Sequence, residues 1–309
     1  MLIIQPRYRH YSAIFVIFIS NLYRQSTGIF MTNSLKLVFL YLLTFGLSQA
    51  VSAIDLSLGD FEEHRYDTPI STEGAKRAPI GRVATNAIIY GQSGNQTHRG
   101  YLSKPADQET QSGLIVIHEW WGLNEDVHAM NNQLAALGYT ALAVDLYNGV
   151  TATEPADAFK LSTHLSNNED QALANLKTAY DYLMNEVGVS KVGVIGWCLG
   201  GKWSLRTALM LPKDIDATVI YYGSLVKNNS QLSKLDMPII GFVGTKDTRL
   251  YKEFLEFEET LKALNKNASI HYYEGAKHAF ANASGLLYQE AAAEDSWERT
   301  ANFLQAHLD

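Results

Sequence analysis

A single cysteine lies where an apolar run ends and an amphipathic segment begins. Residues 196–200 read Gly-Trp-Cys-Leu-Gly, which is the spacing of a G-x-S-x-G nucleophile elbow with Cys in place of Ser. Glycines two positions to either side leave room on such a strained strand-to-helix turn. A helix N-terminus beside the sulfur favours the thiolate. We therefore interpret Cys198 as a nucleophile, the alternative being a tight turn in which Cys198 only packs.

A nucleophile elbow needs an acid and then a histidine further along the chain. Asp247 follows the apolar run at residues 238–243, and His278 follows the run at residues 269–273. Because both come just after the carboxyl ends of expected strands, they would lie at the ligand-binding edge of an open α/β sheet. His278 would accept the thiol proton or stabilise the thiolate, and Asp247 would orient the imidazole ring.

The loop after the apolar run at residues 114–118 is expected to complete this site. The backbone N–H groups of Leu199 and Trp120 are our candidates for the oxyanion hole. Glu119 lies in the same loop, and a carboxylate beside an apolar strand needs a partner, in the site or in a structural salt bridge. Aromatic residues near these motifs are candidates for binding an apolar or neutral acyl group, although some must belong to the core: Trp121, Tyr147, Trp197 and Tyr222.

Composition argues against several other classes of function. The net charge is −7 at pH 7, and Lys and Arg are scattered among acids, so we expect no nucleic-acid partner. One cysteine cannot form an intramolecular disulfide. His118 and Glu119 could begin a zinc motif, but its fifth position is Gly122, so we expect no metal site and no cofactor. The expected partner is a small-molecule substrate, and the oligomeric state stays open.

The rest of the chain alternates short apolar runs with helix-length segments. Strands are predicted at residues 87–90, 100–102, 114–118, 140–144, 192–196, 217–222, 238–243 and 269–273, and helices at residues 125–137, 169–187, 199–210, 251–264 and 288–307. Nearly continuous apolar strands are typical of a parallel sheet buried on both faces. The pattern predicts one α/β domain at residues 84–309, with a mostly parallel sheet and helices on both faces. Residues 54–83 are a polar extension that either covers the pocket or decorates the surface.

The first 53 residues are predicted to be a targeting region. A secretory signal would start at Met31, with Lys36 in its polar start, an apolar stretch at residues 37–47 and a cleavage site after Ala53. We therefore expect the mature protein to be periplasmic or secreted, without a stable membrane span. An uncleaved membrane anchor is the alternative, but each apolar stretch is shorter than the roughly 20 residues that a spanning helix needs.

Several motifs resemble those of the dienelactone hydrolase family, the carboxymethylenebutenolidases of the α/β-hydrolase superfamily. The matching pieces are residues 118–124 (HEWWGLN), 145–147 (DLY), 196–201 (GWCLGG), 221–223 (YYG), 244–247 (GTKD) and 278–280 (HAF). The resemblance implies an α/β-hydrolase fold and a triad of Cys198, His278 and Asp247. It also implies that Glu119 hydrogen-bonds the resting thiol and helps to deprotonate it when substrate arrives. Enol-lactones would be hydrolysed through an acyl-thioester on Cys198.

The chain departs from this family at the substrate carboxylate clamp. The family's arginines follow the Asp-Leu-Tyr and His-x-Phe motifs, where residues 147–149 read Tyr-Asn-Gly and residues 280–282 read Phe-Ala-Asn. A neutral amide does not replace a bidentate guanidinium–carboxylate pair. We therefore expect a hydrolase of small esters or lactones other than the anionic dienelactone. Two alternatives stay open: an acyltransferase with the same residues, and a noncatalytic binding or redox-sensing protein, which would not need Asp247 and His278.

Overall fold

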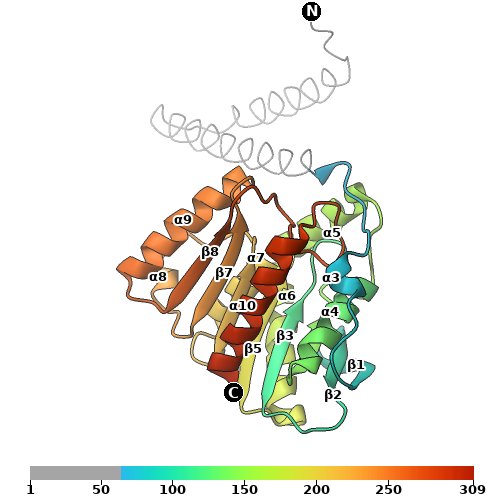
Figure 1. Ribbon diagram of the computed structural model, residues 1–309. Coiled ribbons are helices and arrows are strands. Elements are labelled where there is room, and N and C mark those ends of the chain that lie inside the picture. Colours follow the sequence, from blue (N-terminus) through green and yellow to red (C-terminus); the bar gives the residue numbers. More distant parts are fainter. Residues whose placement is uncertain (1–63) are drawn as a thin grey trace, which may run out of the picture. The chain divides into compact units, whose positions relative to one another are not determined.

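Eight strands form one sheet in the computed structural model, which describes residues 64–309 (Figure 1). Their order across the sheet is β1-β2-β4-β3-β5-β6-β7-β8. The strands are β1 (Val83–Ser93), β2 (Gln96–Pro105), β3 (Ser112–Ile117), β4 (Thr140–Val144), β5 (Lys191–Trp197), β6 (Ala217–Tyr221), β7 (Ile239–Gly244) and β8 (Ala268–Tyr273). β2 runs antiparallel to β1 and to β4, and all other neighbours are parallel, so the predicted mostly parallel sheet is confirmed.

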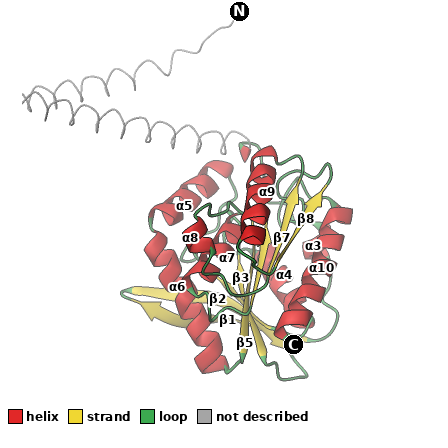
Figure 2. Cartoon of the chain, turned by 90° about the vertical axis from the view of Figure 1, so that its left-hand side faces the viewer, coloured by secondary structure: helices red, strands yellow, loops and turns green. Residues whose placement is uncertain are grey.

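Helices cover both faces of the sheet (Figure 2). They are α3 (Glu73–Lys76), α4 (Glu125–Ala136), α5 (Pro155–Asn167), α6 (Glu169–Tyr182), α7 (Leu199–Met210), α8 (Asn229–Leu232), α9 (Thr248–Ala263) and α10 (Glu290–Leu308), and a π-helical turn at Leu183–Val187 extends α6. α3 and α10 lie on one face, and α5, α6 and α7 lie on the other (Figure 2). The α/β fold expected from the sequence is therefore correct.

The strands and helices predicted from the sequence are present in the structure, and one further long helix was missed. Every residue of β3, β4, β6 and β7 is buried, as expected for strands covered on both faces. All eight strands and all five helices predicted are present, with ends shifted by a few residues. The helix α5 was not predicted. Its buried residues are Pro155, Ala158 and Leu165.

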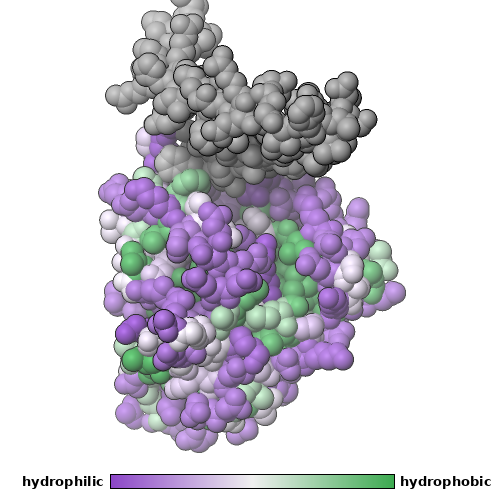
Figure 3. Space-filling model, turned by 180° about the vertical axis from the view of Figure 1, so that it is seen from behind, coloured by the Kyte–Doolittle hydropathy of each residue, from purple (hydrophilic) through white to green (hydrophobic). Residues whose placement is uncertain are grey.

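The surface seen from behind is mostly hydrophilic, with a hydrophobic patch right of the middle and smaller ones nearer the edges (Figure 3). Within residues 64–309, no helix combines the length and the hydropathy that crossing a membrane requires. The predicted targeting region, residues 1–53, lies outside the described residues. The described part of the extension packs on the domain, since Ala75 in α3 is buried.

Candidate active site

The ends of three parallel strands bring together the three residues predicted as a triad. Cys198 follows β5, Asp247 follows β7 as the N-cap of α9, and His278 lies in the loop after β8. His278 Nε2 lies 3.1 Å from Cys198 Sγ, and His278 Nδ1 donates to Asp247 Oδ2 at 2.6 Å. The three side chains therefore form one hydrogen-bonded row, in the geometry that an activated nucleophile requires.

The turn that carries Cys198 is strained, and its glycines cannot be replaced without a collision. Cys198 has φ +54° and ψ −114°, a conformation that L-residues rarely adopt. A Cβ on Gly196 would lie 2.3 Å from the carbonyl carbon of Gly200. A Cβ on Gly200 would lie 2.2 Å from the carbonyl oxygen of Ile117. Close packing of this turn against β3 therefore explains the G-x-C-x-G spacing.

Charge at Cys198 and Asp247 controls the protonation of His278. Burial acts to lower the pKa of His278, but the charge of Cys198 and the hydrogen bond to Asp247 outweigh it and raise that pKa to about 10. Burial acts to raise the pKa of Asp247, but its bond and charge interaction with His278 and the backbone N–H of Leu250 lower it. At neutral pH the row therefore favours a protonated imidazole paired with the carboxylate of Asp247.

The two candidate donors of the oxyanion hole, the backbone N–H groups of Leu199 and Trp120, lie just after two neighbouring strands. Leu199 is the first residue of α7, where a backbone N–H has no intrahelical partner. Trp120 lies in the loop directly after β3, whose strand pairs with β5. Neither amide donates a hydrogen bond to another residue in the range 64–309. Both donors are therefore available to a ligand.

Glu119 is buried, and its contacts differ from those implied by the family resemblance. Its Oε1 accepts from the backbone N–H of Ser284 at 3.2 Å, and its Oε2 accepts from the side-chain amide of Asn282. Burial raises the pKa of Glu119 to about 8. The expected hydrogen bond to the resting thiol is absent in the described structure, because the sulfur of Cys198 faces His278 instead. A structural salt bridge, the alternative reading, is not formed within residues 64–309 either.

Two of the four candidate pocket aromatics lie beside this row. The ring of Tyr222 meets that of His278 edge-on at 5.2 Å, and its hydroxyl donates to Asn282 Oδ1 at 2.8 Å. Tyr147 is 6% exposed, and its hydroxyl has no hydrogen-bond partner within residues 64–309. Burial and then the nearby charge of Cys198 hold the pKa of Tyr147 well above its usual value. The hydroxyl of Tyr147 is therefore a buried polar group whose hydrogen-bonding capacity is unused in the described structure.

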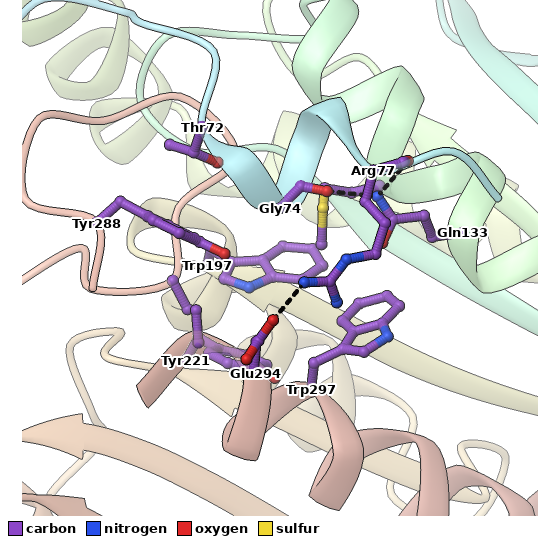
Figure 4. Close-up of a pocket in the computed structure, with 12 residues that line it drawn as sticks. Thr72, Gly74, Arg77, Gln133, Trp197, Tyr221, Tyr288, Glu294 and Trp297 are labelled. Carbon is purple, nitrogen blue, oxygen red and sulfur yellow. Dashed lines mark hydrogen bonds and ion pairs between the residues drawn. The ribbon is translucent and has the colours of Figure 1, made fainter. Parts of the chain in front are cut away.

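The other two candidate aromatics have different surroundings. Trp121 is 1% exposed and packs in a small cluster with Ala152 and Ala158. Trp197 stacks on Tyr221 at 5.3 Å and contributes to a separate pocket beneath α3 (Figure 4). Neighbouring residues at a strand end point to opposite faces of the sheet, which explains why the side chains of Trp197 and Cys198 lie in different surroundings. Substrate binding by Trp197 stays a prediction, and its ring lines a pocket to which Cys198 and His278 do not contribute.

A further residue of this site was missed by the sequence reasoning. The ring of His64 lies 5.1 Å from that of His278 and 5.5 Å from that of Trp120. Its Nδ1 forms a hydrogen bond with Asp67 Oδ2 at 2.7 Å. His64 belongs to the polar extension and to none of the motifs, so the only local signal is a His and an Asp three residues apart. Within residues 64–309, no group of three or more side chains is suited to hold a metal ion.

Comparison with known proteins places this arrangement in a family. A model of the dienelactone hydrolase family matches residues 98–308. The "Protein usf" of Aquifex pyrophilus is 32% identical over 68% of this chain and 94% of its own length. A candidate carboxymethylenebutenolidase of Saccharolobus solfataricus is 28% identical over 71% of this chain and 97% of its own length.

Solved structures agree with the fold. A dienelactone hydrolase-like promiscuous phosphotriesterase from metagenomic libraries has a TM-score of 0.67 at 21% identity, and covers 74% of this chain and 100% of that one. The dienelactone hydrolase of Anabaena variabilis has a TM-score of 0.58 at 20% identity, and covers 74% of this chain and 99% of that one. The architecture is the α/β-hydrolase fold. The protein is an ester or lactone hydrolase, and it belongs to the dienelactone hydrolase family.

Proposed function

We propose that Cys198 is the nucleophile of this hydrolase, with His278 as its acid and base and Asp247 as the residue that orients the imidazole. The observation that carries the proposal is the row Sγ–Nε2–Nδ1–Oδ2, with spacings of 3.1 Å and 2.6 Å at its two hydrogen bonds. Both fall within the reach expected of a nucleophile, its base and the group that orients the base. We assign Leu199 N and Trp120 N to the oxyanion hole, because neither has another partner in the described structure.

Acylation begins with attack of the Cys198 thiolate on the carbonyl carbon of the substrate. The carbonyl oxygen becomes an oxyanion, which the two backbone amides stabilise. When the C–O bond to the leaving group breaks, the protonated His278 gives its Nε2 proton to the departing oxygen. The products of this half-reaction are the alcohol, or the opened chain of a lactone, and an acyl-thioester on Cys198.

Deacylation becomes possible because acylation removes the negative charge of Cys198. The charge of Cys198 is the strongest influence that raises the pKa of His278. Because an acylated sulfur has no charge, the pKa of His278 falls in the acyl-enzyme, and the neutral imidazole can accept a proton from water. The hydroxide that results attacks the thioester carbon. Cleavage of the C–S bond then returns the Cys198 thiolate and releases the carboxylic acid.

The substrate we infer is a small neutral ester or lactone. The segments where the family resemblance would place clamping arginines, residues 147–149 and 280–282, contain no Arg, and their polar side chains include Asn148 and Asn282. Both side chains are already engaged: Asn148 Oδ1 accepts from Gln96, and Asn282 joins the hydroxyl of Tyr222 to the carboxyl of Glu119. A buried, unpaired Tyr147 hydroxyl suits a neutral oxygen of the substrate better than a full charge. These features support recognition by neutral hydrogen bonds.

Glu119 acts, in this proposal, through the loop at residues 282–284. Its two oxygens hold the side chain of Asn282 and the backbone of Ser284, and Asn282 in turn accepts the hydroxyl of Tyr222. Tyr222 packs edge-on against His278. Glu119 is therefore a positioning residue for the imidazole, one step removed from the thiol.

Turnover of p-nitrophenyl acetate by wild type and by Cys198→Ala tests the proposal. The variant should lose about 10³-fold or more of kcat, because it lacks the thiol that is hydrogen-bonded to His278 in the described structure. His164→Ala is the matched control, since His164 is an exposed histidine on α5 and its loss should leave kcat unchanged. Equal rates in wild type and Cys198→Ala would remove the nucleophile assignment.

Export remains a separate proposal, which rests on the sequence pattern of residues 31–53 alone. We infer that the signal is cleaved after Ala53 and that the mature protein is periplasmic or secreted. Mass analysis of the exported protein should give an N-terminus at Ile54. A mature N-terminus upstream of Met31 would contradict this proposal.

A further inference from the structure

The imidazole of His64 reaches the proposed active site from a segment outside the family match. The matched region begins at residue 98, whereas His64 belongs to the N-terminal extension. Its ring nevertheless lies 5.1 Å from that of His278 and 5.5 Å from that of Trp120. The extension therefore supplies part of the surface around the reacting atoms.

The two nitrogens of His64 have different surroundings. Nδ1 is bonded to Asp67 Oδ2 at 2.7 Å, so Asp67 fixes the ring orientation and keeps a proton on Nδ1. Nε2 has no hydrogen-bond partner within residues 64–309. The side chain of His64 is only 19% exposed, and that of Asp67 is 24% exposed. A held, largely covered imidazole with one unused nitrogen is suited to bind a polar group of a ligand.

Hydrogen bonds tie the following residues of the extension to the domain. The backbone N–H of Gly285 donates to the carbonyl of Ile70 at 3.0 Å, and Ser71 forms a β-bridge with Ser284. The Thr72 hydroxyl donates to carbonyl groups of the same loop, those of Asn282 and Ala283, at 3.0 Å each. These contacts fix the chain just after Asp67.

A second attachment lies at α3. The side chain of Gln133 on α4 donates to the carbonyl oxygens of Gly74 and Arg77, and Arg77 pairs with Glu294 on α10 (Figure 4). The segment from Ile70 to Arg77 therefore joins two helices and one active-site loop. The attachment of residues 70–77 to the domain keeps His64 next to His278 and Trp120, at the edge of the proposed site.

We propose that His64, oriented by Asp67, is a specificity-determining residue that selects lactones and esters carrying a hydroxyl group beside the scissile carbonyl. A hydroxyl both donates and accepts, so it matches Nε2 whether the imidazole is neutral or protonated. The proposal rests on the proposed function, because a hydroxyl can be placed there only if the carbonyl is held between Cys198 and the oxyanion donors. His64 takes no part in bond making or breaking.

The test compares two lactones of nearly equal size, α-hydroxy-γ-butyrolactone and α-methyl-γ-butyrolactone. Wild type should have the higher kcat/KM for the hydroxy lactone, mainly through a lower KM. In His64→Phe, a ring still packs on His278 and Trp120 but both nitrogens are lost, and the preference should fall by about 3- to 10-fold. His164→Ala should leave the preference unchanged.

Two amide variants locate the effect on one nitrogen. Gln at position 64 can place its amide near the site of Nε2, whereas Asn can place its amide only near Nδ1. His64→Gln should therefore keep much of the preference for the hydroxy lactone, and His64→Asn should lose it. Equal losses in the two variants, or an unchanged preference in His64→Phe, would overturn the role of Nε2.

The outcomes separate this inference from the proposed function. If wild type hydrolyses the two lactones equally, or hydrolyses neither while it cleaves p-nitrophenyl acetate, the role of His64 is overturned and that of Cys198 stands. If Cys198→Ala retains the wild-type turnover of p-nitrophenyl acetate, the proposed function is wrong. The inference about His64, which rests on it, is then wrong as well.

Discussion

Two regions of the molecule meet at the proposed active site, and they are built in different ways. The first region is the row of Cys198, Asp247 and His278, which the ends of β5, β7 and β8 present directly. The second, which we call the cover, consists of residues 64–77 and the loop at residues 282–285, and these segments are joined by hydrogen bonds and one β-bridge. The first therefore depends on the sheet, and the second on contacts between irregular segments. We expect chemistry to reside in the first region, and specificity and stability to be adjusted by the second.

Breaking the row should have the largest effect. In Asp247→Asn, the amide can no longer act as an anionic acceptor for His278 Nδ1–H, so the imidazolium loses part of its stabilisation. We expect kcat for p-nitrophenyl acetate to fall by about 10²- to 10⁴-fold, the usual range for positioned acid–base catalysis. Asp67→Asn alters the corresponding pair in the cover and should leave that kcat within about twofold. Similar losses of kcat in Asp247→Asn and Asp67→Asn would contradict the view that only the first region carries the chemistry.

Adding one methyl group to each region should sharpen the comparison. In Gly200→Ala, the new Cβ meets the carbonyl oxygen of Ile117 at 2.2 Å, and backbone cannot move aside cheaply. We expect a loss of about 3 kcal/mol in the free energy of unfolding. In Gly74→Ala, the new Cβ meets the hydroxyl of Tyr288 at 3.1 Å, the far end of a side chain that can shift. Its effect should stay within about 0.5 kcal/mol. Urea unfolding of both variants measures the difference, and equal losses would contradict it.

The carboxyl of Glu119, which joins the two regions, should make stability depend on pH. Its pKa is raised to about 8 in the folded protein from 4.5, so the folded state binds more protons and stability falls as pH rises between these values. Glu119→Gln removes this titration. Between pH 5 and pH 6.5, wild type should lose about 2 kcal/mol relative to the variant.

The same pH range avoids interference from His278. Its pKa rises from 6.5 to about 10 on folding, so its contribution is fully present below pH 6.5 and is lost progressively as pH rises from there through 10. Urea unfolding at several pH values gives the two curves. Parallel curves for wild type and Glu119→Gln below pH 6.5 would show that the buried carboxyl is already charged in the folded protein.

Removing one contact of the cover should have the smallest effect. Thr72→Val deletes the hydroxyl that donates to the carbonyl groups of Asn282 and Ala283, and it keeps the shape of the side chain. We expect a loss of about 1 kcal/mol in the free energy of unfolding and an unchanged kcat for p-nitrophenyl acetate. Ser233→Ala, which removes an exposed hydroxyl, is the control. A tenfold fall in kcat in Thr72→Val would show that the cover contributes to catalysis, against this prediction.

The row was predictable from the sequence because each of its members depends on local pattern. The apolar runs before Cys198, Asp247 and His278 identify strands, and parallel strands place their carboxyl ends at one edge. The glycines beside Cys198 mark a turn with no room for a Cβ, as the distances at Gly196 and Gly200 confirm. Spacing along the chain therefore carried enough information to bring three distant residues together.

The cover was not predictable, because none of its contacts follows from spacing. His64 is separated from His278 by more than two hundred residues, and no periodic pattern precedes either Asp67 or Thr72. The partners of Glu119 depend on the path of the loop at residues 282–284, and that path is set by tertiary contacts. The pocket that Trp197 lines was not predictable for a related reason: closeness to Cys198 in the sequence does not determine on which face of the sheet a side chain lies.

Trapping the acyl-enzyme tests the central role of Cys198 most directly. Wild type is mixed with p-nitrophenyl trimethylacetate, whose crowded acyl group slows attack by water, and is quenched in acid for peptide mass analysis. We predict a burst of one nitrophenol per active site, with a trimethylacetyl group on the peptide that contains Cys198, released by neutral hydroxylamine as a thioester should be. A burst whose acyl group is found on a serine, threonine or lysine, with an unmodified Cys198, would contradict the account.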